Sequence, residues 1–133
     1  MQSKLIRNRA KAAQILAFDG LQWGKCRCTD IDMSLDWQGK TFVFIEIKTE
    51  GVPLTLGQRI HLTGLVDGLR KGGKEAYAIV ACHVTPTTED VHVAQCRTDS
   101  IYSGINWERV DTSEKLCVTL DRLYDEHLER QQA

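Results

Sequence analysis

Hydrophobic and polar positions alternate most regularly between Thr29 and Lys48, and this pattern predicts two β-strands joined by a tight turn. The polar break Gln38-Gly39-Lys40 supplies the turn, because glycine tolerates the backbone angles that tight hairpin turns need. The run from Phe42 to Ile47 is apolar enough for a buried central strand, yet Glu46 and then Lys48 interrupt it. Burying either charge costs several kcal/mol unless it finds a partner or a metal.

The polar positions also predict the register of this hairpin. Side chains that face each other across an antiparallel pair lie on the same side of the sheet, so polar residues must meet polar residues. A three-residue loop places Asp32 opposite Glu46 and Asp30 opposite Lys48, whereas a two-residue loop would set an isoleucine against Glu46. The longer loop is therefore favoured. It gathers two aspartates, a glutamate and a lysine on one face, opposite Ile31 and its alternating neighbours.

Two interpretations of these charges stay open. The residues could form cross-strand ion pairs on a solvated face, and such pairs contribute at most about 1 kcal/mol each. Alternatively, carboxylates this close repel each other until a divalent cation neutralises them, and hard oxygen ligands select Mg²⁺ or Mn²⁺. Because apolar residues of the second strand populate both of its faces, neither face is simply solvated, and the metal site is favoured.

The apolar spacing predicts three helices around the hairpin. One runs over about residues 3–18, with a short strand or ordered loop at 21–28 after it. The second covers 55–70 and is expected to present Leu56, Ile60, Leu65 and Leu69 to the sheet. The third covers about 113–130, and its Leu116, Leu120, Leu123 and Leu128 suit either a core face or the seam of a homodimer.

Two further strands are expected after the second helix. Residues 76–82 form an apolar run of strand length, which should lie parallel to its neighbour after the helical crossover. Residues 90–96 alternate well enough for an edge strand, whereas 97–112 show no clear periodicity. The order of elements predicts a three-layer α/β sandwich around a small mixed sheet.

At the hairpin the chain resembles the PD-(D/E)xK nuclease superfamily. The matching pieces are an aspartate at the start of one strand, Glu46-Ile47-Lys48 in the next strand, and Gln58 in the following helix. Asp32 is the better match for the first aspartate because it falls opposite Glu46, and Asp30 is a rival two residues away. The proline that names the motif is absent before either aspartate. The resemblance covers roughly residues 3 to 83.

The resemblance implies a metal-dependent nuclease that hydrolyses phosphodiester bonds in DNA, with an endonuclease favoured. Asp32, Glu46 and the backbone carbonyl of Ile47 would hold one or two Mg²⁺ or Mn²⁺ ions. Lys48 would position or deprotonate the attacking water, or stabilise the phosphate charge. Gln58 would help to orient the carboxylates or the substrate.

The resemblance also implies a restriction-endonuclease-like αβββαβ core, over about residues 3–96 of a single domain that spans 1–133. The C-terminal helix, about 113–130, would be added to this core. A chain of 133 residues is of single-domain size.

Composition describes an ordinary globular protein, with 42% hydrophobic and 26% charged residues. No apolar run approaches the roughly 20 residues of a membrane span, and no signal-peptide pattern opens the chain. Five cysteines cannot all pair within one chain, which favours reduced thiols. We therefore expect a cytoplasmic protein with no membrane partner.

Charge is divided unevenly along the chain. The net charge of −1 argues against strong, sequence-independent binding to nucleic acid. Residues 1–74 nevertheless hold 12 Lys and Arg against 7 Asp and Glu, whereas residues 75–133 hold 5 against 11. The basic excess thus accompanies the candidate site. The candidate contacts to nucleic acid are Lys25, Arg27, Arg59, Lys71 and Lys74.

Two other functions remain open at this point. The same fold could bind nucleic acid or a protein without catalysis, although a pure binder need not keep buried charges. A small metal-dependent hydrolase acting on nucleotides would have a closed pocket in place of an open basic groove. The sequence does not show whether the substrate is DNA or RNA, whether it is linear or branched, or whether cleavage is endonucleolytic or exonucleolytic. The sequence specificity and the oligomeric state also stay open.

Overall fold

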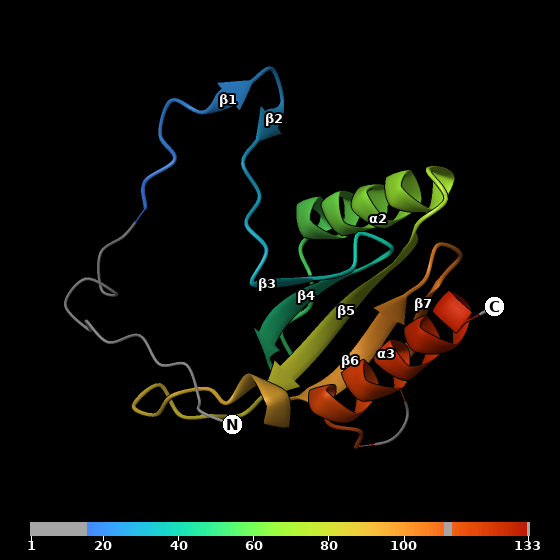
Figure 1. Ribbon diagram of the computed structural model, residues 1–133. Coiled ribbons are helices and arrows are strands. Elements are labelled where there is room, and N and C mark those ends of the chain that lie inside the picture. The colour runs from blue at the N-terminus through green and yellow to red at the C-terminus, as the bar shows by residue number, and fades with distance from the viewer. Residues whose placement is uncertain (1–15, 111–112, 133) are drawn as a thin grey trace.

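A computed structural model describes residues 16–110 and 113–132 (Figure 1). Its centre is a mixed five-stranded sheet of order β3-β4-β5-β6-β7, with helices α2 and α3 on opposite faces. The strands are β3 (Met33–Trp37), β4 (Thr41–Thr49), β5 (Glu75–His83), β6 (Arg97–Tyr102) and β7 (Trp107–Arg109). The helices are α2 (Leu56–Lys71) and α3 (Leu116–Gln132). The predicted α/β architecture with a mixed sheet is confirmed.

The β3–β4 hairpin has the predicted register. The residues that flank the loop, Trp37 and Thr41, pair with each other, as a three-residue loop requires. Gln38 and Gly39 both adopt positive φ, 61° and 67°, which turns the chain sharply. The Asp36 carboxylate accepts the Gly39 N–H at 2.7 Å and stabilises this turn.

Strand β5 lies parallel to β4 after the crossover through α2, as predicted. Phe42 and Phe44 of β4 pack into the cluster beneath α2, whereas Val43 and Ile45 belong to the cluster beneath α3. Since β4 is covered on both faces, it is apolar along most of its length. Alternation then places Glu46 on the α2 side of the sheet.

Helix α2 buries only part of the face that was predicted, since Leu69 packs against the core as expected and two other predicted residues do not. Leu62 and Val66 are its buried residues, and they continue the four-residue spacing that begins at Gln58. Leu56 and Ile60, which were expected to face the sheet, are 73% and 61% exposed. Each lies two residues from Gln58, about 200° around the helix, so burial of the 58-62-66 row turns both outward.

The predicted edge strand at 90–96 is wrong. This segment is a loop that ends in a 3₁₀ turn, Val93–Gln95, and the edge strands of the sheet are β3 and β7. Strand β6 was missed because a bulge opposite Val80 and Ala81 breaks its alternation. Its one fully buried polar side chain, Thr98, is satisfied by Thr119 of α3 at 2.6 Å between the hydroxyl oxygens.

Helix α3 covers the second face of the sheet. Leu116 and Leu123 are buried in its core cluster and Leu120 packs against them, so three of the four leucines serve this chain's own core. At its C-terminal end the buried ring of His127 joins the helix to the hairpin, with Nδ1 2.7 Å from the Thr41 hydroxyl. Neither described helix has the length and apolar character needed to cross a membrane.

Residues 16–28 lie apart from the five-stranded sheet (Figure 1). They contain a small hairpin of β1 (Gln22–Trp23) and β2 (Cys26–Arg27). Most of the predicted N-terminal helix falls outside the described residues, and 16–18, its described end, are not helical. Trp23 is 67% exposed in this segment.

Candidate active site

Asp32 lies beside β4 because its side chain replaces a backbone acceptor. The β3–β4 ladder ends at the pair Met33 and Ile45. The next backbone N–H of β4 on the β3 side, that of Ile47, donates instead to the Asp32 carboxylate at 2.7 Å. Alternation also ends here, since Ile31 packs into the α2-side cluster and not on the face opposite Asp32. This bond fixes Asp32 next to Glu46.

Glu46 is the buried member of the group, with 6% of its surface exposed. Burial, followed by the charge of Asp32 and a side-chain hydrogen bond with it, raises the pKa of Glu46 to about 7. Lys48 opposes this increase in the pKa, and Asp30 adds to it more weakly than Asp32 does. The two carboxyl groups therefore compete to keep a negative charge, and a cation would relieve that competition.

Gln58 is held by its own helix while it reaches the carboxylate. Its Oε1 accepts the Thr55 N–H and its backbone N–H bonds to the Thr55 hydroxyl, both at 3.1 Å, which is a capping box. Its Nε2 donates to Glu46 at 3.2 Å. The predicted neighbour of the carboxylates is therefore in contact with one of them. Thr55 is a positioning residue that the site prediction missed, although Thr-x-x-Gln before a helix signals it.

Lys48 is half-buried and lies two residues beyond Glu46 on the same strand face. Within the described part of the chain it forms no ion pair with a carboxylate. The predicted pairing with Asp30 is not continued by the ladder, which stops at Met33. Lys48 is thus close enough to lower the pKa of Glu46. The N–H donors of its ammonium are not used in an ion pair with any described carboxylate.

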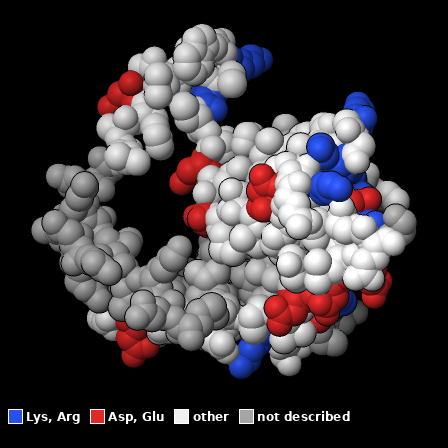
Figure 2. Space-filling model, in the orientation of Figure 1, with Lys and Arg blue, Asp and Glu red and all other residues white. Residues whose placement is uncertain are grey.

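The other predicted contacts to nucleic acid lie in three places. Arg59 follows Gln58 in the first turn of α2. Lys71 and Lys74 lie at the other end of this helix, about 20 Å along its axis from Gln58. Lys25 and Arg27 belong to the separate β1–β2 hairpin. Figure 2 shows basic side chains gathered over the far end of α2, and acidic ones where the chain enters β3.

The donor set fits Mg²⁺ or Mn²⁺. Asp32 and Glu46 offer carboxylate oxygens, and Ile47 between Glu46 and Lys48 offers a backbone carbonyl. No cluster of three or more His, Cys, Asp or Glu side chains suited to a metal occurs among residues 16–110 and 113–132. Mg²⁺ keeps several waters and commonly takes only one or two carboxylates, so this pair is sufficient for it.

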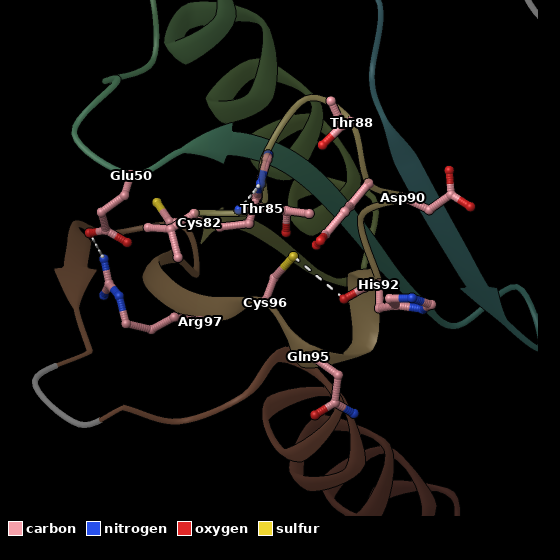
Figure 3. Close-up of a pocket in the computed structure, with 12 residues that line it drawn as sticks. Glu50, Cys82, Thr85, Thr88, Asp90, His92, Gln95, Cys96 and Arg97 are labelled. Atoms are coloured by element: carbon pink, nitrogen blue, oxygen red, sulfur yellow. Dashed lines mark hydrogen bonds and ion pairs between the residues drawn. The ribbon is translucent and has the colours of Figure 1, made fainter.

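A large cavity lies elsewhere, at the carboxyl ends of β4 and β5 (Figure 3). It has a volume of about 820 Å³, and Cys82, Cys96 and the ion pair of Arg97 with Glu50 are among its lining residues. None of Asp32, Glu46 and Lys48 lines it. The carboxylate pair is therefore outside this cavity.

No protein-family model, curated protein or solved structure matches this chain. The chemistry of the site must then be inferred from its own residues. Two adjacent carboxylates, one of them oriented by an amide, can bind a divalent cation. The Lys48 ammonium, which has no carboxylate partner among the described residues, can donate a hydrogen bond beside that cation.

Proposed function

We propose that this protein is a metal-dependent nuclease that hydrolyses phosphodiester bonds in DNA. The observation that carries the proposal is the contact between Asp32 and the buried Glu46, two carboxyl groups fixed by Ile47 N–H and by Gln58. A structural ion-pair network would have placed Lys48 against one of them. The antiparallel β3–β4 pair, followed by the α2 crossover to a parallel β5, supports the resemblance to the PD-(D/E)xK superfamily and its restriction-endonuclease-like core.

Each residue then has a distinct role. Asp32, Glu46 and the Ile47 carbonyl would hold the ion, with Gln58 fixing the orientation of Glu46. The bound ion supplies acidity to water and neutralises charge on the phosphate. Lys48, two residues from Glu46, hydrogen-bonds the attacking water or a phosphate oxygen through its ammonium.

The exposure of the site favours a polymeric substrate over a free nucleotide. Asp32 is exposed to solvent, and neither Asp32 nor Glu46 lines the cavity of about 820 Å³. A nucleotide hydrolase would need a closed pocket around these groups. A DNA backbone, in contrast, can approach an open site from outside.

A cleavage assay tests the proposal directly. Purified protein is incubated with single-stranded, duplex and four-way-junction DNA, in the presence of Mg²⁺, Mn²⁺ or EDTA. We expect metal-dependent cleavage of at least one substrate, which also distinguishes linear from branched DNA. Loss of the activity in Glu46→Ala excludes a contaminating nuclease. If the protein binds these substrates but cleaves none with either metal, the binding-module alternative is correct.

Metal should stabilise the folded protein more at high pH than at low pH. The cation binds ionised Glu46, whose pKa is about 7, so protons compete with it below that value. From about pH 8 to about pH 6 the apparent affinity should fall about tenfold. Thermal melts of EDTA-treated protein, titrated with MnCl₂ at each pH, measure this. A melting temperature unchanged by millimolar Mn²⁺ at the higher pH would contradict the site.

The two aspartates should differ in importance. Asp32→Ala is expected to abolish metal-dependent cleavage, because Asp32 bonds to Ile47 N–H and contacts Glu46. Asp30→Ala should only weaken cleavage, since Asp30 acts on Glu46 through charge alone. Initial rates at saturating Mg²⁺ measure both variants. The reverse ranking would move the metal ligand to Asp30.

A further inference from the structure

Arg59 is a cation held in place by an aromatic ring and not by a carboxylate. Its guanidinium carbon lies 5.2 Å from the centre of the Trp107 ring. Four other described arginines form ion pairs with acidic side chains, namely Arg70, Arg97, Arg109 and Arg122. Arg59 has no such partner within the described ranges, so its hydrogen-bond donors remain available to a ligand.

The ring beneath Arg59 is itself fixed. Trp107 opens β7, pairs with Tyr102 of β6, and packs against the cluster that contains Leu62 and Val66 of α2. The Tyr102 and Trp107 rings lie 5.5 Å apart, and the Tyr102 hydroxyl donates to Asp67 of α2 at 2.6 Å. The guanidinium is thus stacked on a rigid surface that joins the helix to the edge of the sheet.

Arg59 and Gln58 point in two directions from one turn of α2. Gln58 reaches Glu46 on β4, and Arg59 reaches Trp107 on β7. Three strand spacings separate β4 from β7, or about 14 Å. Successive phosphates of a B-form strand rotate around the helix axis as well as rising about 3.4 Å along it, so neighbours lie roughly 7 Å apart and this span corresponds to about two phosphates.

We propose that Arg59, stacked on Trp107, binds a backbone phosphate about two nucleotides from the bond that the carboxylate site cleaves. The inference rests on the proposed nuclease function. A guanidinium matches phosphate geometry with two parallel hydrogen bonds. Because Arg59 already covers one face of the Trp107 ring, that face cannot stack on a base. The contact that Arg59 makes is therefore with a phosphate charge, and it does not depend on the DNA sequence.

Binding without cleavage gives the first test. The affinity for a duplex of about 20 base pairs is measured by fluorescence anisotropy in EDTA, over a range of salt concentrations. Arg59→Ala should raise Kd about fivefold or more. The slope of log Kd against log salt concentration should fall by about one, as expected for the loss of one phosphate contact. Arg122→Ala removes the same charge from α3, on the opposite face of the sheet, and should leave both unchanged.

The ring is tested separately from the charge. Trp107→Phe keeps an aromatic face under Arg59 and should bind DNA much as the parent does. Trp107→Leu keeps the charge of Arg59 but removes the ring that positions it, and should weaken binding by an intermediate amount. Thermal melts confirm that each variant is folded, so that weaker binding is not a consequence of unfolding.

The position of the contact is tested with neutralised phosphates. A series of duplexes carries one methylphosphonate at each position from one to five nucleotides on either side of the cleaved bond. Near the second position, about 14 Å away, neutralisation should slow the parent as much as Arg59→Ala does, and should have no further effect in that variant. Additive losses at every position would overturn the assignment.

The two proposals fail in different ways. If the parent cleaves DNA and Arg59→Ala binds and cleaves as the parent does, the phosphate contact is wrong while the nuclease function stands. If DNA binding depends on Arg59 but no metal supports cleavage, the phosphate contact stands and the catalytic function is wrong. Absence of any binding to duplex DNA overturns the phosphate contact.

Discussion

Replacing Lys48 with alanine should slow DNA cleavage by about 10²-fold or more, the usual effect of removing a positioned acid–base or charge-stabilising group. Lys48 lies two residues beyond Glu46 on one strand face and has no carboxylate partner in the described part of the chain. Its ammonium should therefore reach the water or phosphate that the metal holds. Metal affinity should stay the same or increase slightly, because a repulsion between cation and ammonium is removed.

Single-turnover rates with duplex DNA, together with melts in Mn²⁺, measure the two effects of Lys48→Ala. DNA binding should weaken only modestly, since one phosphate contact among several is lost. Lys115→Ala is the matched control, because Lys115 is exposed at the start of α3 and its side chain makes no described ion pair. If Lys48→Ala cleaves like the parent, Lys48 has no role in the chemistry and its charge serves the structure alone.

The hairpin that carries the site could be predicted from the sequence because the side-chain period of a strand is two. A shift of one residue would have moved Glu46 and every neighbouring side chain to the other face, so the polar positions permitted one register. The parallel β5 was predictable for a related reason. An apolar run after a helix of crossover length has few other places to pair.

The details of the carboxylate pair did not follow from alternation. Strand β3 ends at Met33, and the Asp32 side chain then takes a backbone N–H that a regular ladder would have paired with main chain. Strand periodicity therefore placed Asp32 near Glu46 but could not show what holds it there. The capping box at Thr55 was visible in the sequence, yet only the structure shows that the Gln58 amide caps the helix and contacts Glu46 at once.

Strands β6 and β7 were not predictable because their stability does not come from an apolar alternating face. Asp99 is the extra residue of the bulge in β6, and it accepts from both Arg97 and Arg109. Thr98 is buried against Thr119, a residue 21 positions later in the chain. Pairings between polar groups distant in sequence leave no local periodicity. The three residues of β7 are too few to show any.

Replacing Glu46 with glutamine should stabilise the metal-free protein at about pH 8 while abolishing metal binding. The folded-state pKa, about 7, lies above the ordinary value of 4.5, so the folded state is favoured by a bound proton. That contribution is fully present below about pH 4.5 and is lost as the pH rises through about 7. Above that pH, the ionised Glu46 costs the fold on the order of 3 kcal/mol.

The introduced amide removes this cost without changing the shape of the side chain. Its oxygen can still accept from Gln58, and its NH₂ can donate to the Asp32 carboxylate in place of the shared proton. At about pH 5 Glu46 is already protonated, so the parent and the variant should have similar stability there. The advantage of the variant should appear between these two pH values.

Urea unfolding of metal-free parent and Glu46→Gln, at about pH 5 and about pH 8, measures the difference. Glu75→Gln is the control, because Glu75 is in a partly exposed ion pair with Arg70 at 3.2 Å, and its loss should destabilise by at most about 1 kcal/mol. In saturating Mn²⁺ the parent should gain stability and Glu46→Gln should not. If Glu46→Gln is less stable than the parent at about pH 8, the Glu46 charge stabilises the fold as an ion-pair partner of Lys48. No cation would then be needed to relieve a repulsion between the carboxylates.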